Sequence, residues 1–151
     1  MLSFTRKTEY GLIAMVNLAE LPEGELISAR QMAEVTRGSQ SLLTNVLKDL
    51  ATCGYVVSVR GSRGGYRLAG DPAKINVAEL VTSLEGPVHL TQCVVHSRDS
   101  DQDGSCDMLE SCQIIGPVRL VQEKLNGVLS SMTLADMVES ISLSSVDETC
   151  G

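Results

Sequence analysis

Apolar residues recur at helical spacing through the first third of the chain and predict three helices there. The first covers residues 8–20, where Gly11 is the one weak helix former. A short second helix is expected over about 29–36, because Ser28 and Gln31 have the spacing of a capping box. Ser39 is expected to cap a third helix, ending near Gly54, with one apolar stripe formed by Leu42, Leu43, Val46, Leu47 and Leu50. Two short helices joined by a turn that contains glycine predict a helix-turn-helix.

A β-hairpin is predicted directly after the third helix. Residues 55–60 are rich in β-branched side chains, residues 61–65 hold three glycines, and residues 66–68 supply the returning strand. Asn76 and Glu79 resemble a second capping box, which predicts a short helix over 77–85. Residues 1–87 are therefore predicted to form a winged helix-turn-helix domain that ends at Gly86-Pro87.

The apolar pattern changes twice in the second half of the chain. It is lost over residues 88–116, which we expect to form a loop, called the cysteine loop below. Pro117 suits a first helical position, and a heptad-like seam follows it: Val118, Val121, Leu125, Val128 and Met132, extended by Ala135. One helix cannot bury that seam alone. It packs either on its own winged-helix domain or on the same helix of a second subunit, and we favour the second subunit.

These elements predict a mainly α fold with a small β-hairpin wing, followed by a long dimerisation helix. The helix and a short following turn are expected over 117–138, and a flexible tail over 139–151. With no Trp and one Phe, the core must be aliphatic. No apolar run is long enough to span a bilayer, and the first residues lack the pattern of a signal peptide, so we expect a cytoplasmic protein with no membrane partner.

The charge of the chain is divided unequally between its two halves. The net charge of -7 would argue against a nucleic-acid partner if it were spread evenly. Residues 1–74, however, hold nine basic and seven acidic side chains, whereas residues 75–151 hold three basic and twelve acidic ones. The half that contains the predicted winged helix is therefore the half able to approach DNA.

Two groups of polar side chains are candidates for DNA contact. One lies near the N-terminus of the third helix, the end that a recognition helix presents to base edges, and comprises Ser39, Gln40, Ser41 and Asn45. The other lies in the wing and comprises Arg60, Arg63 and Arg67, of which Arg63 is the best candidate. Alternatively, these groups only solvate a turn and a hairpin.

Three cysteines in the cysteine loop, Cys93, Cys106 and Cys112, are candidates for metal or redox chemistry. In a cytoplasmic chain such cysteines are poor candidates for disulfides. A structural zinc site would need a fourth ligand, for which His96 is available, but it usually contains a close pair of cysteines that this chain lacks. An iron-sulfur cluster tolerates irregular spacing. Cluster, zinc and three unliganded thiols all remain open from the spacing.

The remaining chemistry-bearing residues do not predict an enzyme. His89 and His96 have no arrangement of Ser, Cys or carboxylate partners typical of a catalytic triad, and no phosphate-binding glycine loop is present. Cys53 is expected to be a small core residue and Cys150 a thiol of the tail.

From residue 3 to about 138 the chain resembles the Rrf2 family of bacterial winged-helix transcription regulators. The resemblance is carried by TRKTEYGL at 5–12, SLLTNVLKDLATCGYVVSVRGSRGGYRLA at 41–69, INVAELVTSLEGP at 75–87, and the cysteine loop before a long helix. It implies a homodimer with crossed long helices that binds a double-stranded DNA operator. We expect this dimer to act as a repressor. In members that carry the cysteines, it also implies a 2Fe–2S or 4Fe–4S cluster that controls operator affinity.

The resemblance also implies a ligand set. Cys93, Cys106 and Cys112 match the three cluster cysteines, although the gap between the first two is longer than in several members. Glu9 stands where some relatives contribute a carboxylate from the other subunit, and Ile115 stands where others have a histidine. Loss or oxidation of the cluster, in response to redox state, iron, nitric oxide or cluster supply, is then expected to free Glu9 and to change the spacing of the two recognition helices. The alternative is a zinc-stabilised or cluster-free repressor that uses its thiols as a redox switch.

Overall fold

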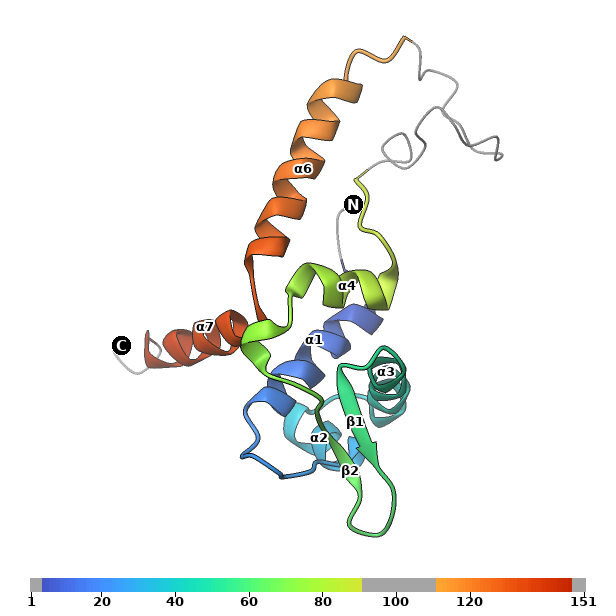
Figure 1. The fold of residues 1–151 in the computed structure, drawn as a ribbon, viewed down its shortest axis with the longest axis vertical. Coiled ribbons are helices and arrows are strands. Elements are labelled where there is room, and N and C mark those ends of the chain that lie inside the picture. Colours follow the sequence, from blue (N-terminus) through green and yellow to red (C-terminus); the bar gives the residue numbers. More distant parts are fainter. Residues whose placement is uncertain (1–3, 91–110, 148–151) are drawn as a thin grey trace.

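The computed structural model describes residues 4–90 and 111–147, which form a mostly helical structure with one β-hairpin (Figure 1). The elements are α1 (Arg6–Ala19), α2 (Ala29–Thr36), α3 (Gln40–Thr52), β1 (Val56–Val59), β2 (Gly65–Leu68), the 3-10 turn η1 (Pro72–Lys74), α4 (Val77–Glu85), α6 (Ile115–Ser131) and α7 (Leu134–Asp147). The predicted winged helix is thereby confirmed. Within the described ranges, no helix is long and apolar enough to cross a membrane.

The core of the winged-helix domain is aliphatic, as its composition requires. Met15 of α1, Leu47 of α3 and Leu80 of α4 are completely buried in one cluster. Gly11 is buried where α1 meets α4, and a Cβ at that position would collide with the side chain of Leu84. The weak helix former is therefore located where the side chain of Leu84 packs directly on the backbone of α1.

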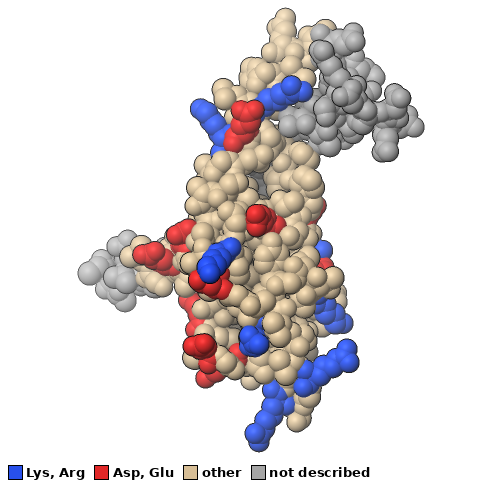
Figure 2. Space-filling view, in the orientation of Figure 1, with Lys and Arg blue, Asp and Glu red and all other residues tan. Residues whose placement is uncertain are grey.

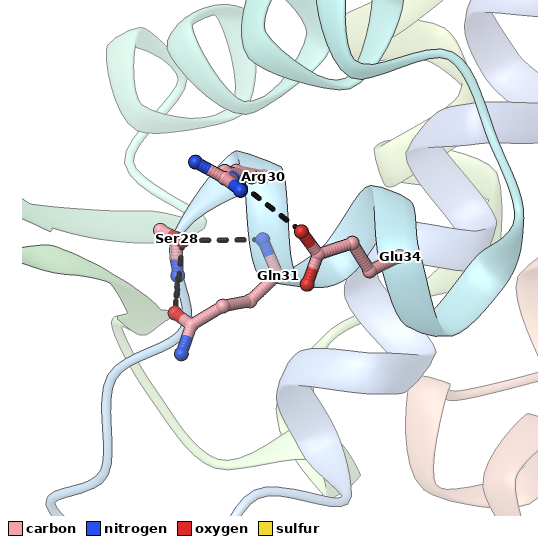
Figure 3. A network of polar contacts seen from close by, with 4 residues as sticks. All are labelled: Ser28, Arg30, Gln31 and Glu34. Carbon is pink, nitrogen blue, oxygen red and sulfur yellow. Dashed lines mark hydrogen bonds and ion pairs between the residues drawn. The ribbon is translucent and has the colours of Figure 1, made fainter.

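Local capping explains why α2 and α3 begin where they do. The backbone amide of Ser28 donates to Gln31 Oε1 (3.0 Å) and the amide of Gln31 donates to Ser28 Oγ (3.2 Å), which is the predicted capping box (Figure 3). Arg30 Nε and Glu34 Oε1, one turn apart on the same helix, form an ion pair at 3.1 Å. Ser39 Oγ accepts from the amide of Leu42 at 3.4 Å and begins α3.

The wing is an antiparallel hairpin whose glycines are needed for close backbone contacts. A Cβ at Gly64 would collide with the carbonyl of Val59 across the turn, and one at Gly65 would press on the backbone of Ile27. Ile27 forms an isolated bridge with Tyr66, with hydrogen bonds of 3.1 and 2.8 Å in the two directions. Gly64 thus allows the tight hairpin turn, and Gly65 allows the loop before α2 to pack against the wing.

The long helix differs from the prediction at both ends. It begins at Ile115, so Pro117 lies inside its first turn, and it ends at Ser131. Met132 has an extended backbone, and its carbonyl accepts from the amide of Val77 at 3.0 Å. Because the helix stops there, Ala135 lies on α7, and the predicted extension of the seam to that residue is wrong.

A helix also occupies much of the region where the sequence predicts a turn and a flexible tail. Thr133 and Asp136 cap α7 in both directions: the Thr133 amide donates to Asp136 Oδ2 (2.7 Å), and the Asp136 amide donates to Thr133 Oγ1 (3.2 Å). Leu134 is completely buried in the core cluster, and α7 packs against α1. These tertiary contacts make the start of α7 part of the winged-helix domain, beyond the boundary expected at residue 87.

Candidate nucleic-acid interface

The N-terminal half of α3 presents polar side chains on one exposed face. Gln40, Ser41 and Asn45, all predicted to contact DNA, are exposed there, and together with Thr44 they line a shallow hollow in the surface. Thr44 is absent from the sequence-based prediction, although its spacing of four residues from Gln40 puts it on the same face. Its hydroxyl donates to the Gln40 carbonyl at 2.8 Å, which leaves its oxygen free only to accept.

Ser39 has a structural role that the sequence-based prediction does not separate from DNA contact. Its hydroxyl accepts from the Leu42 amide and lies 3.1 Å from Ser41 Oγ. Its backbone amide donates to the phenol oxygen of Tyr10 on α1 at 3.1 Å. Ser39 therefore caps α3 and fixes the end of that helix against α1.

A further cation lies just ahead of α3. Arg37 ends α2 in the left-handed conformation, with φ of 52°, and is exposed. A non-glycine residue in this conformation is uncommon, and here it turns the chain from α2 into α3. It brings a positive charge next to a helix N-terminus, a place that favours phosphate groups. The Arg-Gly pair directly before Ser39 is the feature of the sequence from which this cation could have been predicted.

The three arginines predicted for the wing divide into two positions. Arg60 and Arg63 are exposed in the turn between β1 and β2. Arg67 lies within β2, paired with Val57, and lines a separate hollow with Glu23 and other residues of the α1–α2 loop. Arg60 and Arg63 are therefore at the tip of the wing, whereas Arg67 is at its base.

The charges on the surface follow the division seen in the sequence. Figure 2 shows Lys and Arg side chains projecting from the end of the molecule where the hairpin lies. Many of the Asp and Glu side chains gather along the side toward α7. The basic end and the exposed face of α3 belong to the same domain, so a DNA duplex approaching α3 would meet the basic end.

Of the candidate metal ligands, Cys112 and Glu9 fall among the described residues, and they lie in different parts of the fold. Cys93 and Cys106 lie outside the described residues. Cys112 is partly exposed ahead of α6, at the end of that helix that points away from the body of the domain (Figure 1). Glu9 is exposed in the first turn of α1, within that body. Over residues 4–90 and 111–147 no group of three metal-binding side chains is present. Cys53 is exposed at the end of α3 and is not the core residue expected from the sequence.

The first turn of α1 is tied to the end of α4. Thr5 donates its backbone amide to Glu85 Oε1 at 2.6 Å. Slight desolvation raises the pKa of Glu85, but the polar groups of Thr8 and Thr5 close to the carboxylate, among them the Thr5 amide, favour its charged form and outweigh it. The pKa of Glu85 is therefore held below its ordinary value of 4.5. The turn that carries Glu9 is thus fixed beside the point where the chain leaves α4.

Comparison with known proteins agrees with this geometry. The family model Rrf2, described as an iron-dependent transcriptional regulator, matches residues 4–140. Among solved structures, the chain is similar to CymR (YrzC), the global cysteine regulator of B. subtilis, with a TM-score of 0.72, 26% identity, and coverage of 93% of this chain and 98% of that one. It is also similar to a putative transcriptional regulator from Listeria innocua (TM-score 0.70, 30% identity, coverage 91% and 86%) and to T. potens IscR (0.68, 28%, 93% and 88%).

The match extends over the winged helix, α6 and the start of α7, so it includes both the candidate DNA-binding face and the long helix. The family resemblance expected from the sequence is therefore confirmed. The chain belongs to the Rrf2 family, whose members are DNA-binding transcription regulators and not enzymes.

Proposed function

We propose that this protein is a homodimeric repressor whose affinity for a double-stranded DNA operator is controlled by an iron-sulfur cluster. The observation that carries the DNA-binding part is the exposed polar face of α3 beside a basic wing. A repressor acts where the DNA is, which in a bacterial cell is the cytoplasm.

In the proposed complex α3 enters the major groove. Gln40, Ser41 and Asn45 meet base edges there, while Ser39 keeps the helix end in place. Arg60 and Arg63 at the wing tip reach phosphates or the adjacent minor groove. Arg67, nearer the base of the wing and beside acidic residues, makes the weaker phosphate contact.

The exposed side of α6 supports the homodimer. Ile114, Val121 and Val128 follow one another at intervals of seven residues and are 63%, 54% and 60% exposed. Val118 and Leu125 lie between them and are only partly buried. This is the spacing of a coiled-coil seam, and a second copy of α6 would cover it. Two recognition helices would then face half-sites about one helical turn of DNA, or a multiple of it, apart.

The donor set fits an iron-sulfur cluster. Thiolates of Cys93, Cys106 and Cys112 would hold it, with Glu9 of the second subunit as the fourth ligand, since Glu9 is exposed on the body of the domain and not at the end of α6 near Cys112. The bound cluster would supply reversible redox and ligand-exchange chemistry. Glu9 then ties the cysteine loop of one subunit to α1 of the other, and its release changes the distance between the recognition helices.

The similarity to a global cysteine regulator favours a second candidate. In that case the protein binds no cluster, and its thiols alone, or a stabilising zinc ion, set its affinity for DNA. Both candidates share the DNA-binding face and the dimer.

Anaerobic purification with a visible spectrum and analysis of iron, sulfide and zinc tests the proposal. We expect visible absorbance, with iron and sulfide in equal amounts. Cys106→Ala should remove the absorbance and leave a folded dimer, whereas the matched control Cys53→Ala, at the exposed end of α3, should retain it. A colourless wild-type protein after attempted reconstitution, or full absorbance in Cys106→Ala, would refute the cluster assignment.

A further inference from the structure

One polar side chain of α6 is buried although the helix around it is not. Gln122 is 4% exposed, whereas its neighbours Val121 and Glu123 are exposed. Of the described residues of α6, Gln122 alone is buried. A buried amide is costly unless all its hydrogen-bonding groups find partners, so its surroundings must supply them.

The partners of Gln122 are mostly backbone atoms from the chain that follows α4. Gln122 Oε1 accepts from the amide of Leu90 at 2.8 Å, and Nε2 donates to the carbonyl of Val88, also at 2.8 Å. Nε2 also donates to Asn126 Oδ1 at 2.9 Å. The side-chain amide therefore pairs with residues 88–90 as a neighbouring strand would, and fastens them to the middle of α6.

A second attachment holds the C-terminal end of α6. Asn76 Nδ2 donates to the carbonyl of Ser130 at 2.7 Å, and the Val77 amide donates to the carbonyl of Met132 at 3.0 Å. At 1.5 Å per residue, the two attachments are separated by about 12–15 Å along the helix. Two separated points fix the direction of a rod, whereas one point leaves it free to pivot. The two attachments, with the packing of α6 on α4, fix the angle of α6, and the Gln122 contact is the attachment nearer to the cysteine loop.

The same contact lies at the entrance to the cysteine loop. The chain runs from Leu90 to Cys93 in three residues, and Gln122 adjoins Val121 of the exposed seam. We propose, on the basis of the proposed function, that Gln122 is a positioning residue that couples the state of the cysteines to the geometry of the dimer. A change at the cysteines acts through Leu90 and Gln122 on the angle of α6, and hence on the distance between the two recognition helices.

Gln122→Met tests this coupling, because methionine has a similar size and helix propensity but cannot form the hydrogen bonds. The matched control is Glu123→Met, at the exposed residue that follows Gln122 on α6. Two quantities are measured: the exchange rate of the Leu90 amide proton, and the ratio of DNA affinities between cluster-loaded protein and protein stripped with a chelator. The probe is a duplex that the wild-type protein selects from a random pool.

We expect Gln122→Met to accelerate exchange of the Leu90 amide by about 5- to 100-fold, as loss of a buried hydrogen bond implies. The affinity ratio, which for a typical allosteric coupling is about 5- to 150-fold in the wild type, should fall close to one. Glu123→Met should change neither. Cluster content should remain that of the wild type, since a purely structural defect would lower it.

The outcomes separate the two proposals. A wild-type protein whose DNA affinity does not respond to the cluster refutes the proposed function, and the coupling with it. A normal wild-type ratio that persists in Gln122→Met, despite faster exchange, refutes the coupling alone, as does unchanged exchange. If Gln122→Met fails to fold, Leu90→Pro removes the same hydrogen bond from the other side and must give the same loss of response.

Discussion

The winged-helix domain and the long helix α6 differ in how far their apolar side chains are buried within one chain. In the first region Ser28 and Ser39 cap their helices, and the core behind α3 is completely buried. In α6 the apolar seam is exposed, and among its described residues Gln122 is the buried one. The winged-helix domain is therefore packed within one chain, whereas the exposed seam of α6 supports the proposal that a second copy covers it.

The largest effect on stability should come from truncating a side chain in the core of the winged-helix domain. Leu47→Ala removes a completely buried side chain of α3 and should lower the free energy of unfolding by about 2–5 kcal/mol. The same truncation on α6, Leu120→Ala, removes a half-exposed side chain off the seam and should change it by less than about 0.5 kcal/mol. Thermal and urea unfolding of both variants measures the difference. Equal losses would contradict the division into two regions.

The next effect separates folding from assembly. Val121→Asp puts a charge into the proposed seam and should weaken dimerisation by about 2–4 kcal/mol, because the charge must be desolvated on pairing. Sedimentation equilibrium measures the association, and circular dichroism should show unchanged helix content. Leu120→Asp is the control, since its side chain lies off the seam. A dimer that is equally weakened by both variants would refute the seam.

The same comparison shows what a sequence can predict. The bounds of α2 could be predicted because its stop and start signals are local, namely Ser28, Gln31 and the turn before Ser39. The start of α7 has a comparable signal in Thr133 and Asp136, and apolar residues follow it at helical spacing, so this helix was predictable as well. Ala135 was assigned to the wrong helix because heptad spacing continues across the bend at Met132.

The site was harder to predict than the fold. Exposure of the α3 face follows from amphipathic spacing, but the cap role of Ser39 depends on Tyr10, which is distant in sequence. Gln122 could not be recognised from sequence, because its two partners outside α6 are backbone atoms more than thirty residues away, and a residue of any type has the same backbone atoms. A side chain whose partners are distant backbone atoms cannot be identified from the residue types in the sequence.

A smaller effect concerns the two positions within the wing. Arg63→Ala should weaken operator binding by about 1 kcal/mol and reduce the slope of log affinity against log salt by about one, because one fewer phosphate contact releases one fewer counterion. Arg67→Ala, at the base of the wing beside Glu23, should have the weaker effect. Arg119→Ala on α6 controls for the change in net charge. Fluorescence anisotropy over a salt series measures all three, and an unchanged slope for Arg63→Ala would indicate a base contact or a structural role.

The smallest effect is the pH dependence of the contact between α1 and α4. The pKa of Glu85 is lowered in the folded protein, so the stabilisation is present above its ordinary value of 4.5 and is lost as the pH falls through the lower, folded value. Because Glu85 is largely solvated, the gain is a few tenths of a kcal/mol, about the size of an exposed ion pair. Glu85→Gln should therefore be slightly less stable than the wild type at pH 7 and equal to it at strongly acidic pH. Urea unfolding across that range measures the difference, with Glu25→Gln, exposed in the loop between α1 and α2, as the control. A difference that persisted or grew in acid would mean that the hydrogen bond to Thr5 does not depend on the charge of the carboxylate.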